Sequence, residues 1–415
     1  MHLCCFLQIK LIIFAFYISC ANNKDFAVLM NSLDIKDFHA GNWVQRREYK
    51  SFSPDPICMQ WMLSDPELLQ LMSAADHSIG KLDAFADLVP DVDFFIKMHI
   101  TKEATVSNKI EGTQTTFEEA LAKEDNIDAE KRDDWNEVHN YIKALNEAIT
   151  EMERLPISNR LICQAHKTLL QGVRGKNKLP GVYRTSQNWI GATLKEATFV
   201  PPTHEEIPGL MNDLEQFINA ELIPLPIQVP HLVKIAMIHY QFETIHPFLD
   251  GNGRIGRLLI TLYLADKGLL HKPTLYLSDF FERNRRYYYD NLTAVRTGNQ
   301  MLQWVKFFLT GVIETAKNGI ETFQQIIKLR EDVEMTRLHT LGRKQPEGKK
   351  LMTELYKQPI LEGMQIAELL AVHPSTANRL ISDFMAMGIL KEMTGHKRNR
   401  VYSFDEYIRL FDSRH

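Results

Sequence analysis

The sequence predicts a mainly α-helical protein with a small β-hairpin in its middle and a winged helix-turn-helix domain at its C-terminus. Apolar residues recur at helical spacing through most of the chain. Residues 231–245 are apolar on nearly every side, which is typical of a buried central helix. Strand-forming stretches are confined to a turn-rich segment at 176–202 and to a short segment at 388–401.

The chain has 415 residues, a length that allows two or three domains. Hydrophobic residues make up 45% and charged residues 24%, as in ordinary globular proteins. The net charge of −4 disfavours general coating of nucleic acid but leaves a local basic patch open. We expect five segments: a leader or misassigned start (1–29), an N-terminal helical domain (30–130), a central core (131–310), a helix and linker (311–345) and the winged helix-turn-helix module (346–415).

The N-terminus has two interpretations. The apolar run at 11–18 resembles the core of a signal peptide, although it is too short for a membrane span and only Lys10 flanks it. Alternatively, Met30 opens the protein. We favour the second interpretation because Cys58 and Cys163 are the only cysteines beyond residue 20 and form no disulfide framework or metal spacing. A reducing, cytoplasmic location without a membrane partner is therefore expected.

Residues 94–111 have the pattern of a helix that ends in the sequence SNKIEGT. Gly112 is placed as its C-terminal cap, and Glu111 lies in its last turn. Because a carboxylate at a helix C-terminus opposes the helix dipole, Glu111 should have a cationic partner elsewhere. The plainer alternative is a solvated surface glutamate.

Further amphipathic helices are predicted at 135–155, 159–170 and 207–220. The segment between the last two is rich in turn residues and reads as a hairpin stopped by Pro201 and Pro202. Its exposed edge could accept a peptide as an added strand, or it could be an ordinary surface hairpin.

Residues 246–257, HPFLDGNGRIGR, bring together an imidazole, a carboxylate, three glycines and two guanidiniums. The apolar pattern that follows predicts that the glycines open a helix, whose unpaired N–H groups and dipole form an anion site. His246 can take a proton near neutral pH, and Asp250 suits Mg²⁺. Arg254 and Arg257 lie one turn apart and can clamp phosphate oxygens.

Other kinds of nucleotide-binding and metal sites are excluded. GNGRIG also fits the dinucleotide pattern GxGxxG, but that pattern needs a preceding strand, and a long apolar helix precedes it here. The chain has no Walker loop and no kinase signature set. A hydrolytic metal site would need more ligands than His246 and Asp250 supply. Phosphoryl or nucleotidyl transfer remains.

Beyond this motif, 278–309 is rich in aromatic residues that should be mostly core, and His239 is expected to be a core histidine. A long helix is predicted at 310–338 and a linker at 342–350. Residues 351–409 have the pattern of a winged helix-turn-helix. The wing tip at 395–400 is basic and could touch DNA, but a protein-binding or dimerisation module fits as well.

HPFLDGNGRIGR resembles the signature of the Fic family, H-x-F-x-[DE]-G-N-G-R-x-x-R, and meets every specified position. Residues 40–125 look like the N-terminal domain that accompanies Fic in many bacterial proteins. The hairpin ending in FVPP is similar to the family's target-binding flap, and SNKIEG matches its inhibitory motif, [ST]-x-x-x-E-[GN]. The resemblance therefore implies a Fic-type helical bundle with a β-hairpin flap, and winged-helix modules are frequent companions of it.

The resemblance further implies transfer of AMP from ATP, with Mg²⁺, to a Ser, Thr or Tyr hydroxyl of a target protein or of the enzyme itself. By resemblance His246 is the general base, Asp250 the Mg²⁺ ligand, and Phe248 a packing residue. Asn252 is expected to contact the α-phosphate and Arg257 the γ-phosphate. The remaining ATP-binding positions would be Gly251, Gly253, Arg254, Ile255, Gly256 and, beside the adenosine, Tyr288.

The match at SNKIEG rests on Ser107 and Glu111 and supplies the cationic partner sought above. In the family the inhibitory glutamate pairs with the second arginine of the motif, here Arg257, and keeps the γ-phosphate out. Since SNKIEG precedes the Fic core, inhibition should act within the chain. In some members the same glutamate also positions water to remove AMP.

Partners follow from the same resemblance. A hydroxyl-bearing protein target should dock on the hairpin at 188–201, and a homodimer through the N-terminal domain or the winged helix is open. The alternative function is a DNA-binding regulator that keeps the Fic core as a nucleotide sensor. The intact His246 and Asp250 disfavour that alternative, because a bare sensor would not need them.

Overall fold

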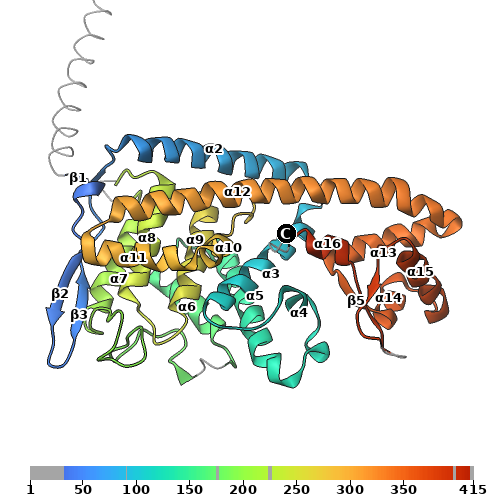
Figure 1. Ribbon diagram of the computed structural model, residues 1–415, viewed down its shortest axis with the longest axis horizontal. Coiled ribbons are helices and arrows are strands. Elements are labelled where there is room, and N and C mark those ends of the chain that lie inside the picture. Colours follow the sequence, from blue (N-terminus) through green and yellow to red (C-terminus); the bar gives the residue numbers. More distant parts are fainter. Residues whose placement is uncertain (1–31, 90, 174–176, 223–226, 396–398, 412–415) are drawn as a thin grey trace, which may run out of the picture.

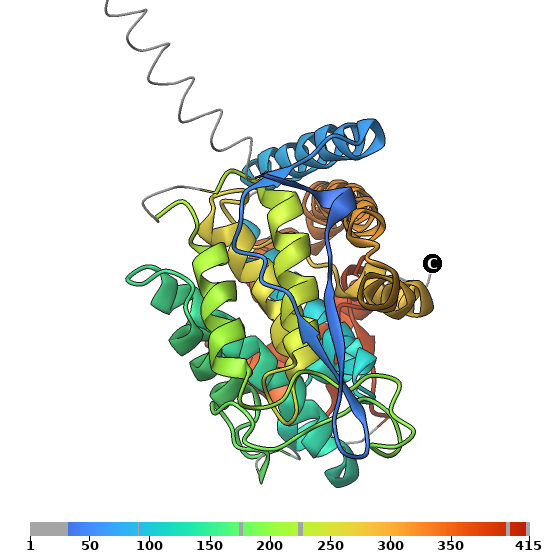
Figure 2. The ribbon, with the colours of Figure 1, turned by 90° about the vertical axis from the view of Figure 1, so that its left-hand side faces the viewer.

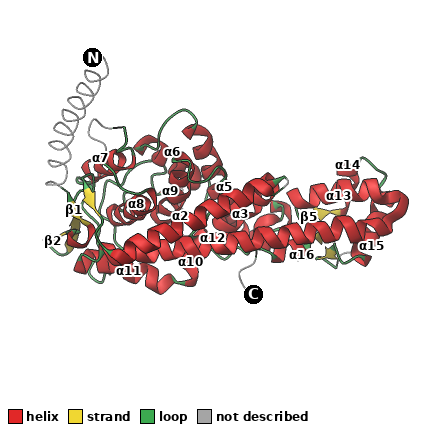
Figure 3. Ribbon diagram, turned by 90° about the horizontal axis from the view of Figure 1, so that it is seen from above, coloured by secondary structure: helices red, strands yellow, loops and turns green. Residues whose placement is uncertain are grey.

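The computed structural model describes residues 32–89, 91–173, 177–222, 227–395 and 399–411. The molecule is elongated and mainly helical, and its few strands lie at the two ends (Figures 1 and 3). Among the helices described, none combines the length and the hydrophobicity that a membrane span requires. The leader predicted at 1–29 lies outside the described residues.

The N-terminal part consists of two small sheets and a long helix. The strands are β1 (Leu33–Asp34), β2 (Gly41–Gln45), β3 (Lys50–Pro54) and β4 (Trp61–Met62), with β1 parallel to β4 and β2 antiparallel to β3. Helix α2 (Pro66–Leu88) follows, capped by Asp65, whose side chain accepts the N–H of Leu68. It lies along α12 (Met301–Asp332), and together they form the long edge of the molecule (Figure 1).

Helix α8 (His231–Ile245) is the buried centre that its sequence predicts: every residue from Leu232 to Ile245 is buried. It packs against α9 (Asn252–Asp266), α7 (Ile207–Ile218) and α12. The other helices of this half are α3 (Val92–Ile110), α4 (Phe117–Leu121), α5 (Arg132–Met152), α6 (Asn159–Leu169), α10 (Ser278–Arg283) and α11 (Arg285–Gly298). The helices predicted from apolar periodicity at 94–111, 135–155, 159–170 and 207–220 are confirmed with shifted ends.

The segment predicted as a hairpin, residues 188–201, is called the flap below. It contains one antiparallel bridge, between Ile190 and Phe199, so the two arms of the predicted hairpin pair at a single bridge. Its second arm is covered, because the N–H of Phe52 in β3 donates to the Val200 carbonyl at 2.9 Å. Figure 2 shows the β2–β3 hairpin reaching down beside the flap loops. The uncovered edge of the flap is therefore its first arm.

The C-terminal part contains helices where a linker was predicted. Helix α12 begins earlier than the predicted 310 and passes through a π-helical turn (Val333–Arg337) and a 3₁₀ segment (Leu338–Lys344). Only Gly342, at φ 54°, breaks the path before α13 begins at Gln345. The elements that follow are α13 (Gln345–Lys357), β5 (Ile360–Glu362), α14 (Gly363–Leu370), α15 (Pro374–Ala386), β6 (Lys391–Glu392), β7 (Val401–Ser403) and α16 (Asp405–Arg409).

These last elements form the C-terminal module, described over 345–411 without 396–398. Its three strands lie in the order β5-β7-β6, and three of the six predicted basic-tip residues, 396–398, lie outside the described residues. The module packs on the N-terminal half of α3: the Phe95 ring meets Tyr356 and Tyr407 at centroid distances of 6.1 and 6.0 Å. The opposite end of α3 carries Glu111.

Candidate active site

The loop between α8 and α9, residues 246–251, is called the motif loop. His246 ends α8 at φ 50° and ψ 60°, in the left-handed region that a residue with a Cβ rarely adopts. Gly251 is also left-handed, at φ 78°, and added side-chain atoms there would approach Leu169 and His166. The motif loop thus begins and ends with a residue in the left-handed conformation, and the first turn of α9 lies beside His246.

Asn252 and Phe248 hold the motif loop closed. The Asn252 amide accepts the Phe248 N–H at 2.9 Å and donates to the Phe248 carbonyl at 2.8 Å. The Phe248 ring is fully buried and stacks on His166 at 3.7 Å, which places it as the packing residue that was predicted. The predicted contact of Asn252 with an α-phosphate stays a prediction, because the amide nitrogen has two hydrogens and the bond to Phe248 uses one of them.

His166 and Arg184 also hold the loop, and sequence reasoning missed both. His166 Nε2 donates to the Asp250 carbonyl at 2.9 Å, and its Nδ1 accepts the Gly181 N–H at 2.8 Å, which fixes the tautomer. The Arg184 guanidinium donates from Nε to the His246 carbonyl at 3.0 Å. His166 was one position in an amphipathic helix, and Arg184 lay in a turn-rich segment with no periodicity, so neither gave a sequence signal.

His246 is positioned as a neutral base. Its Nδ1 lies 3.4 Å from the Glu243 carbonyl, and since a carbonyl only accepts, Nδ1 carries the hydrogen in this contact. Nε2 then keeps its lone pair. Burial lowers the pKa of His246 to about 4, so the imidazole is unprotonated at neutral pH.

Arg254 and Asp250 contribute a cation and a carboxylate to the site. Arg254 is buried and donates from NH1 to Glu137 at 3.2 Å and to Asn108 at 3.3 Å, and from NH2 to Asp250 Oδ1 at 3.3 Å. Its Nε is buried without a partner among the described residues. Asp250 Oδ1 also accepts the Gly251 N–H at 2.6 Å. Both bonds from described residues fall on Oδ1, which leaves Oδ2 available to a cation.

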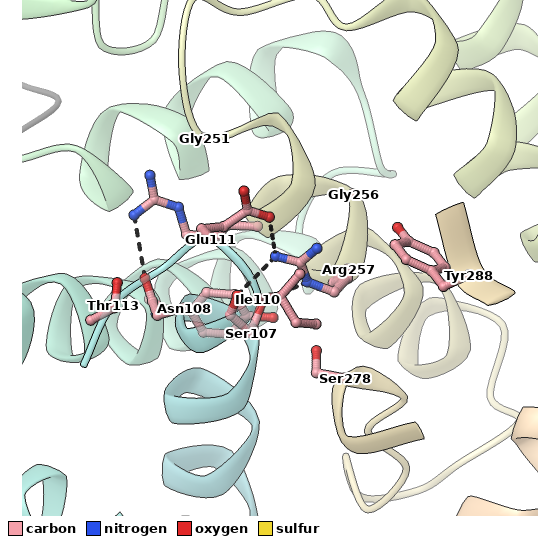
Figure 4. Close-up of polar contacts among 12 residues, drawn as sticks. Ser107, Asn108, Ile110, Glu111, Thr113, Gly251, Gly256, Arg257, Ser278 and Tyr288 are labelled. Atoms are coloured by element: carbon pink, nitrogen blue, oxygen red, sulfur yellow. Dashed lines mark hydrogen bonds and ion pairs between the residues drawn. The ribbon is translucent and has the colours of Figure 1, made fainter. Parts of the chain in front are cut away.

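Arg257 is held by the end of α3 (Figure 4). Its NH2 donates to Glu111 Oε1 at 2.7 Å and to the Ser107 carbonyl at 2.9 Å, and its Nε donates to Ser107 Oγ at 2.9 Å. Burial alone would raise the pKa of Glu111, but the Arg257 cation outweighs it and keeps the pKa below its usual value. Burial alone would lower the pKa of Arg257, and the Glu111 carboxylate raises it instead. The cationic partner predicted for Glu111 is therefore present.

The Glu111 carboxylate lies on the first turn of α9. A Cβ built at Gly253 would collide with Glu111 Oε1 and come within 3.0 Å of Arg257 NH1. The side chain of Glu111 is nevertheless 35% exposed, so part of it faces solvent. A carboxylate thus occupies the place where a helix N-terminus and two arginines favour an anion.

Two further predicted positions lie in the core. Tyr288 is 1% exposed, and its hydroxyl donates to His239 Nε2 at 2.8 Å, so its ring does not face solvent beside a nucleotide as predicted. The side chain of Ile255 is also buried. His239 is the core histidine that was expected: its Nδ1 donates to the Gly256 carbonyl at 3.0 Å.

Glu243 is an unpredicted acid in this region. Its Oε1 is buried without a partner among the described residues, and it lies so close to Gly256 that a Cβ there would collide with it. Burial raises the pKa of Glu243 to about 7. An apolar helix predicted as pure core gave no reason to single it out.

The site combines a neutral imidazole, two buried arginines, a helix N-terminus and a carboxylate with a free oxygen. No cluster of three or more His, Cys, Asp or Glu residues suited to a metal is found among the described residues. The imidazole, the arginines and the helix N-terminus are suited to binding a polyphosphate and taking a proton from a nucleophile.

Comparisons with known proteins match this site. The description "Fic/DOC family N-terminal" matches residues 69–150 and "Fic/DOC family" matches residues 156–264. The protein adenylyltransferase Fic of Aedes aegypti is 26% identical over 258 residues, which cover 59% of this chain and 45% of that protein. A probable protein adenylyltransferase of Aquifex aeolicus is 25% identical over 238 residues, 55% of this chain and 68% of that protein.

The match therefore spans less than half of the Aedes aegypti relative. Among solved structures, a Fic family protein from Desulfovibrio desulfuricans G20 has a similar fold, with a TM-score of 0.51, 20% identity, and coverage of 82% of this chain and 96% of that one. Both family descriptions fall on the segments that build the site, and the complete signature, residues 246–257, forms the motif loop and the start of α9. The chain belongs to the Fic family.

Proposed function

We propose that the chain is a self-inhibited protein adenylyltransferase, which moves AMP from ATP to a Ser, Thr or Tyr hydroxyl of a target protein and of itself. The observation that carries the proposal is the ion pair of Glu111 with Arg257 over the first turn of α9. There, the Glu111 carboxylate occupies a place that suits an anion, and the neighbouring His246 is a neutral base. The adenylyltransferase names of the relatives support the same reaction class.

The residues present fit ATP. A phosphate chain is an anion like the Glu111 carboxylate and suits the same helix N-terminus. The glycine at 253 allows close approach of backbone N–H groups, and the partnerless Arg254 Nε offers a further donor. Tyr289, whose side chain is 42% exposed next to the buried Tyr288, replaces the latter as our candidate beside the adenosine.

The residues also fit a magnesium ion. Asp250 Oδ2 would hold it together with phosphate oxygens, which are the hard ligands that Mg²⁺ prefers. When bound, the ion would offset charge on the phosphates. Asn252 closes the motif loop and has a second amide hydrogen for an α-phosphate oxygen.

The transfer follows from the position of His246. The target hydroxyl oxygen forms a bond to the α-phosphorus, the bond from that phosphorus to the α,β-bridging oxygen breaks, and pyrophosphate leaves. His246 Nε2 receives the hydroxyl proton, while Nδ1–H stays directed at the Glu243 carbonyl. Arg254 and Arg257 bind the negative charge of the leaving pyrophosphate.

Inhibition acts through Arg257. While the guanidinium is bonded to Glu111 and Ser107, it cannot bind the γ-phosphate, and the Glu111 carboxylate repels the phosphate chain. Withdrawal of Glu111 therefore activates the enzyme. We also propose that Glu111 can position a water to remove AMP, as some Fic proteins do.

The target docks on the flap as an added strand. The second arm is covered by β3, so the incoming segment uses the first arm, where Trp189 and Ile190 are exposed at 42% and 40%. Recognition through main-chain bonds gives no information on the target's own side chains. Consumption of ATP fits a cytoplasmic location.

The test is transfer of label from ATP to protein. With ATP labelled at the α-phosphate, the Glu111→Gly variant should label protein strongly, and His246→Ala in that background should abolish labelling. ATP labelled at the γ-phosphate should give none. Label arriving from the γ-phosphate alone would replace this proposal with kinase-like transfer. Release of AMP from pre-modified protein by the wild type tests the removal reaction.

A second candidate function, DNA binding, is favoured by the order β5-β7-β6 beside three helices, which fits a winged helix. Helix α15 exposes Asn378 and Arg379 toward solvent. A salt-sensitive gel shift that is lost on Arg379→Ala would support it, and no shift at low salt would exclude it.

A further inference from the structure

Arg184 is a buried cation caged by main-chain carbonyls. It is 2% exposed, and it donates to the carbonyls of His246 at 3.0 Å, Ser186 at 3.1 Å and Pro202 at 2.5 Å. Its own N–H donates to the Pro247 carbonyl at 2.9 Å. A planar guanidinium with donors on three nitrogens can make such a set at fixed angles, whereas a lysine cannot.

These bonds join the motif loop to both ends of the flap. Ser186 and Pro202 flank the flap, and His246 and Pro247 begin the motif loop. His246 is in the left-handed conformation, which is unfavourable for a residue with a Cβ. Two bonds from Arg184, one from its side chain and one from its backbone, fall on this strained turn.

We propose that Arg184 is the residue that positions His246 for the reaction: it holds the left-handed turn and fixes both flap ends relative to the imidazole, so that a hydroxyl presented by the flap meets Nε2. This inference rests on the proposed function. It differs from a purely structural role because the Arg184 cation also acts on the imidazole.

Several charged groups face His246. Burial is the main reason for its low pKa, and the cations of Arg184 and Arg296 lower it further, while the Glu111 carboxylate raises it. Glu243 contributes through its carbonyl. Removing the charge at 184 should therefore make His246 easier to protonate.

The experiment compares Arg184→Met, Arg184→Lys and the matched control Arg46→Met in the Glu111→Gly background. Arg46 is a half-buried arginine beside the flap that bonds Glu206 and Ser51 and does not touch the motif loop. The rate of α-label transfer is measured against pH. A titration of His246 by nuclear magnetic resonance reads its pKa without catalysis.

Arg184→Met should lower kcat by about 10- to 100-fold and raise the pKa of His246 by about half a unit to one unit. Arg184→Lys should lose rate but keep the parent pKa, because it retains charge without the planar geometry. Arg46→Met should keep both the parent rate and the parent pKa of His246. An unchanged rate and pKa in Arg184→Met would overturn the proposal, and so would a full rate in Arg184→Lys if the methionine variant does not fold. Absence of label in the parent would refute the proposed function, while the titration would still test Arg184.

Discussion

Neutralising Glu111 without changing its shape is the most informative perturbation of this molecule. The Glu111→Gln variant keeps the side-chain volume and the hydrogen-bond acceptor but removes the charge that faces Arg257. At the observed 2.7 Å, the Coulomb attraction is about 6 kcal/mol for an effective dielectric constant of about 20. Because the carboxylate is 35% exposed, solvent screening and desolvation reduce the net value to about 1–3 kcal/mol.

That free energy sets two expected results. Since 1.4 kcal/mol corresponds to about a tenfold change, ATP should bind Glu111→Gln about 5- to 150-fold more tightly, and α-label transfer at limiting ATP should rise by a similar factor. The variant should also have a free energy of unfolding that is lower by about 1–3 kcal/mol, because the buried Arg257 cation is left with neutral partners.

The assay is calorimetric titration with an ATP analogue that carries a methylene between the α- and β-phosphorus, so that binding is measured without transfer. Thermal unfolding with and without the analogue tests the second result, because the ligand should stabilise the variant more than the wild type. Glu118→Gln, an exposed glutamate on α4, is the control and should match the wild type. Equal affinities in all three proteins would refute the reasoning.

Three further predictions follow. Gly256→Ala should destabilise the protein by about 1–3 kcal/mol, because the new Cβ meets the buried Glu243 carboxyl, whereas Gly80→Ala in open space on α2 should stabilise it by about 0.5–1 kcal/mol in the same denaturant titration. Burial lowers the pKa of His166 to about 4, so between pH 6.5 and 4 the unfolded chain binds a proton that the folded chain does not. Thermal stability should therefore fall as pH falls through that window, by up to about 1.4 kcal/mol per pH unit, and His166→Gln should reduce the slope. Phe95→Ala, at the contact of α3 with the C-terminal module, should lower the free energy of unfolding by about 3–5 kcal/mol. It should also raise basal α-labelling, because α3 carries Glu111 at its other end. Unchanged labelling in the folded variant would show that this contact does not affect inhibition.

The sequence was sufficient where chemistry is local. Apolar residues on nearly every side placed α8 at the centre, and a carboxylate at the end of α3 required a cation because it opposes the helix dipole. The partner, Arg257, lies 146 positions away, and it was named through the family resemblance rather than from spacing.

The sequence was insufficient where a side chain's role depends on which segments meet. The sequence did not show that the Asn252 amide closes its own loop, because the N–H and carbonyl of Phe248 meet it only in the folded motif loop. A tyrosine can stack on a nucleotide base, but Tyr288 packs beside His239 in the core. The bonds of His166 and Arg184 to distant carbonyls leave no periodic trace in the chain.

Under the proposed function, the position of Glu111 over Gly253 would make the glutamate a tethered competitor of ATP. Because it belongs to the same chain, its effective concentration at the α9 N-terminus does not change on dilution of the protein. The apparent affinity for ATP is then the intrinsic affinity multiplied by the fraction of molecules whose glutamate is withdrawn. Raising ATP overcomes such a competitor only gradually, whereas a partner that pulls on α3 changes that fraction directly, even at constant ATP.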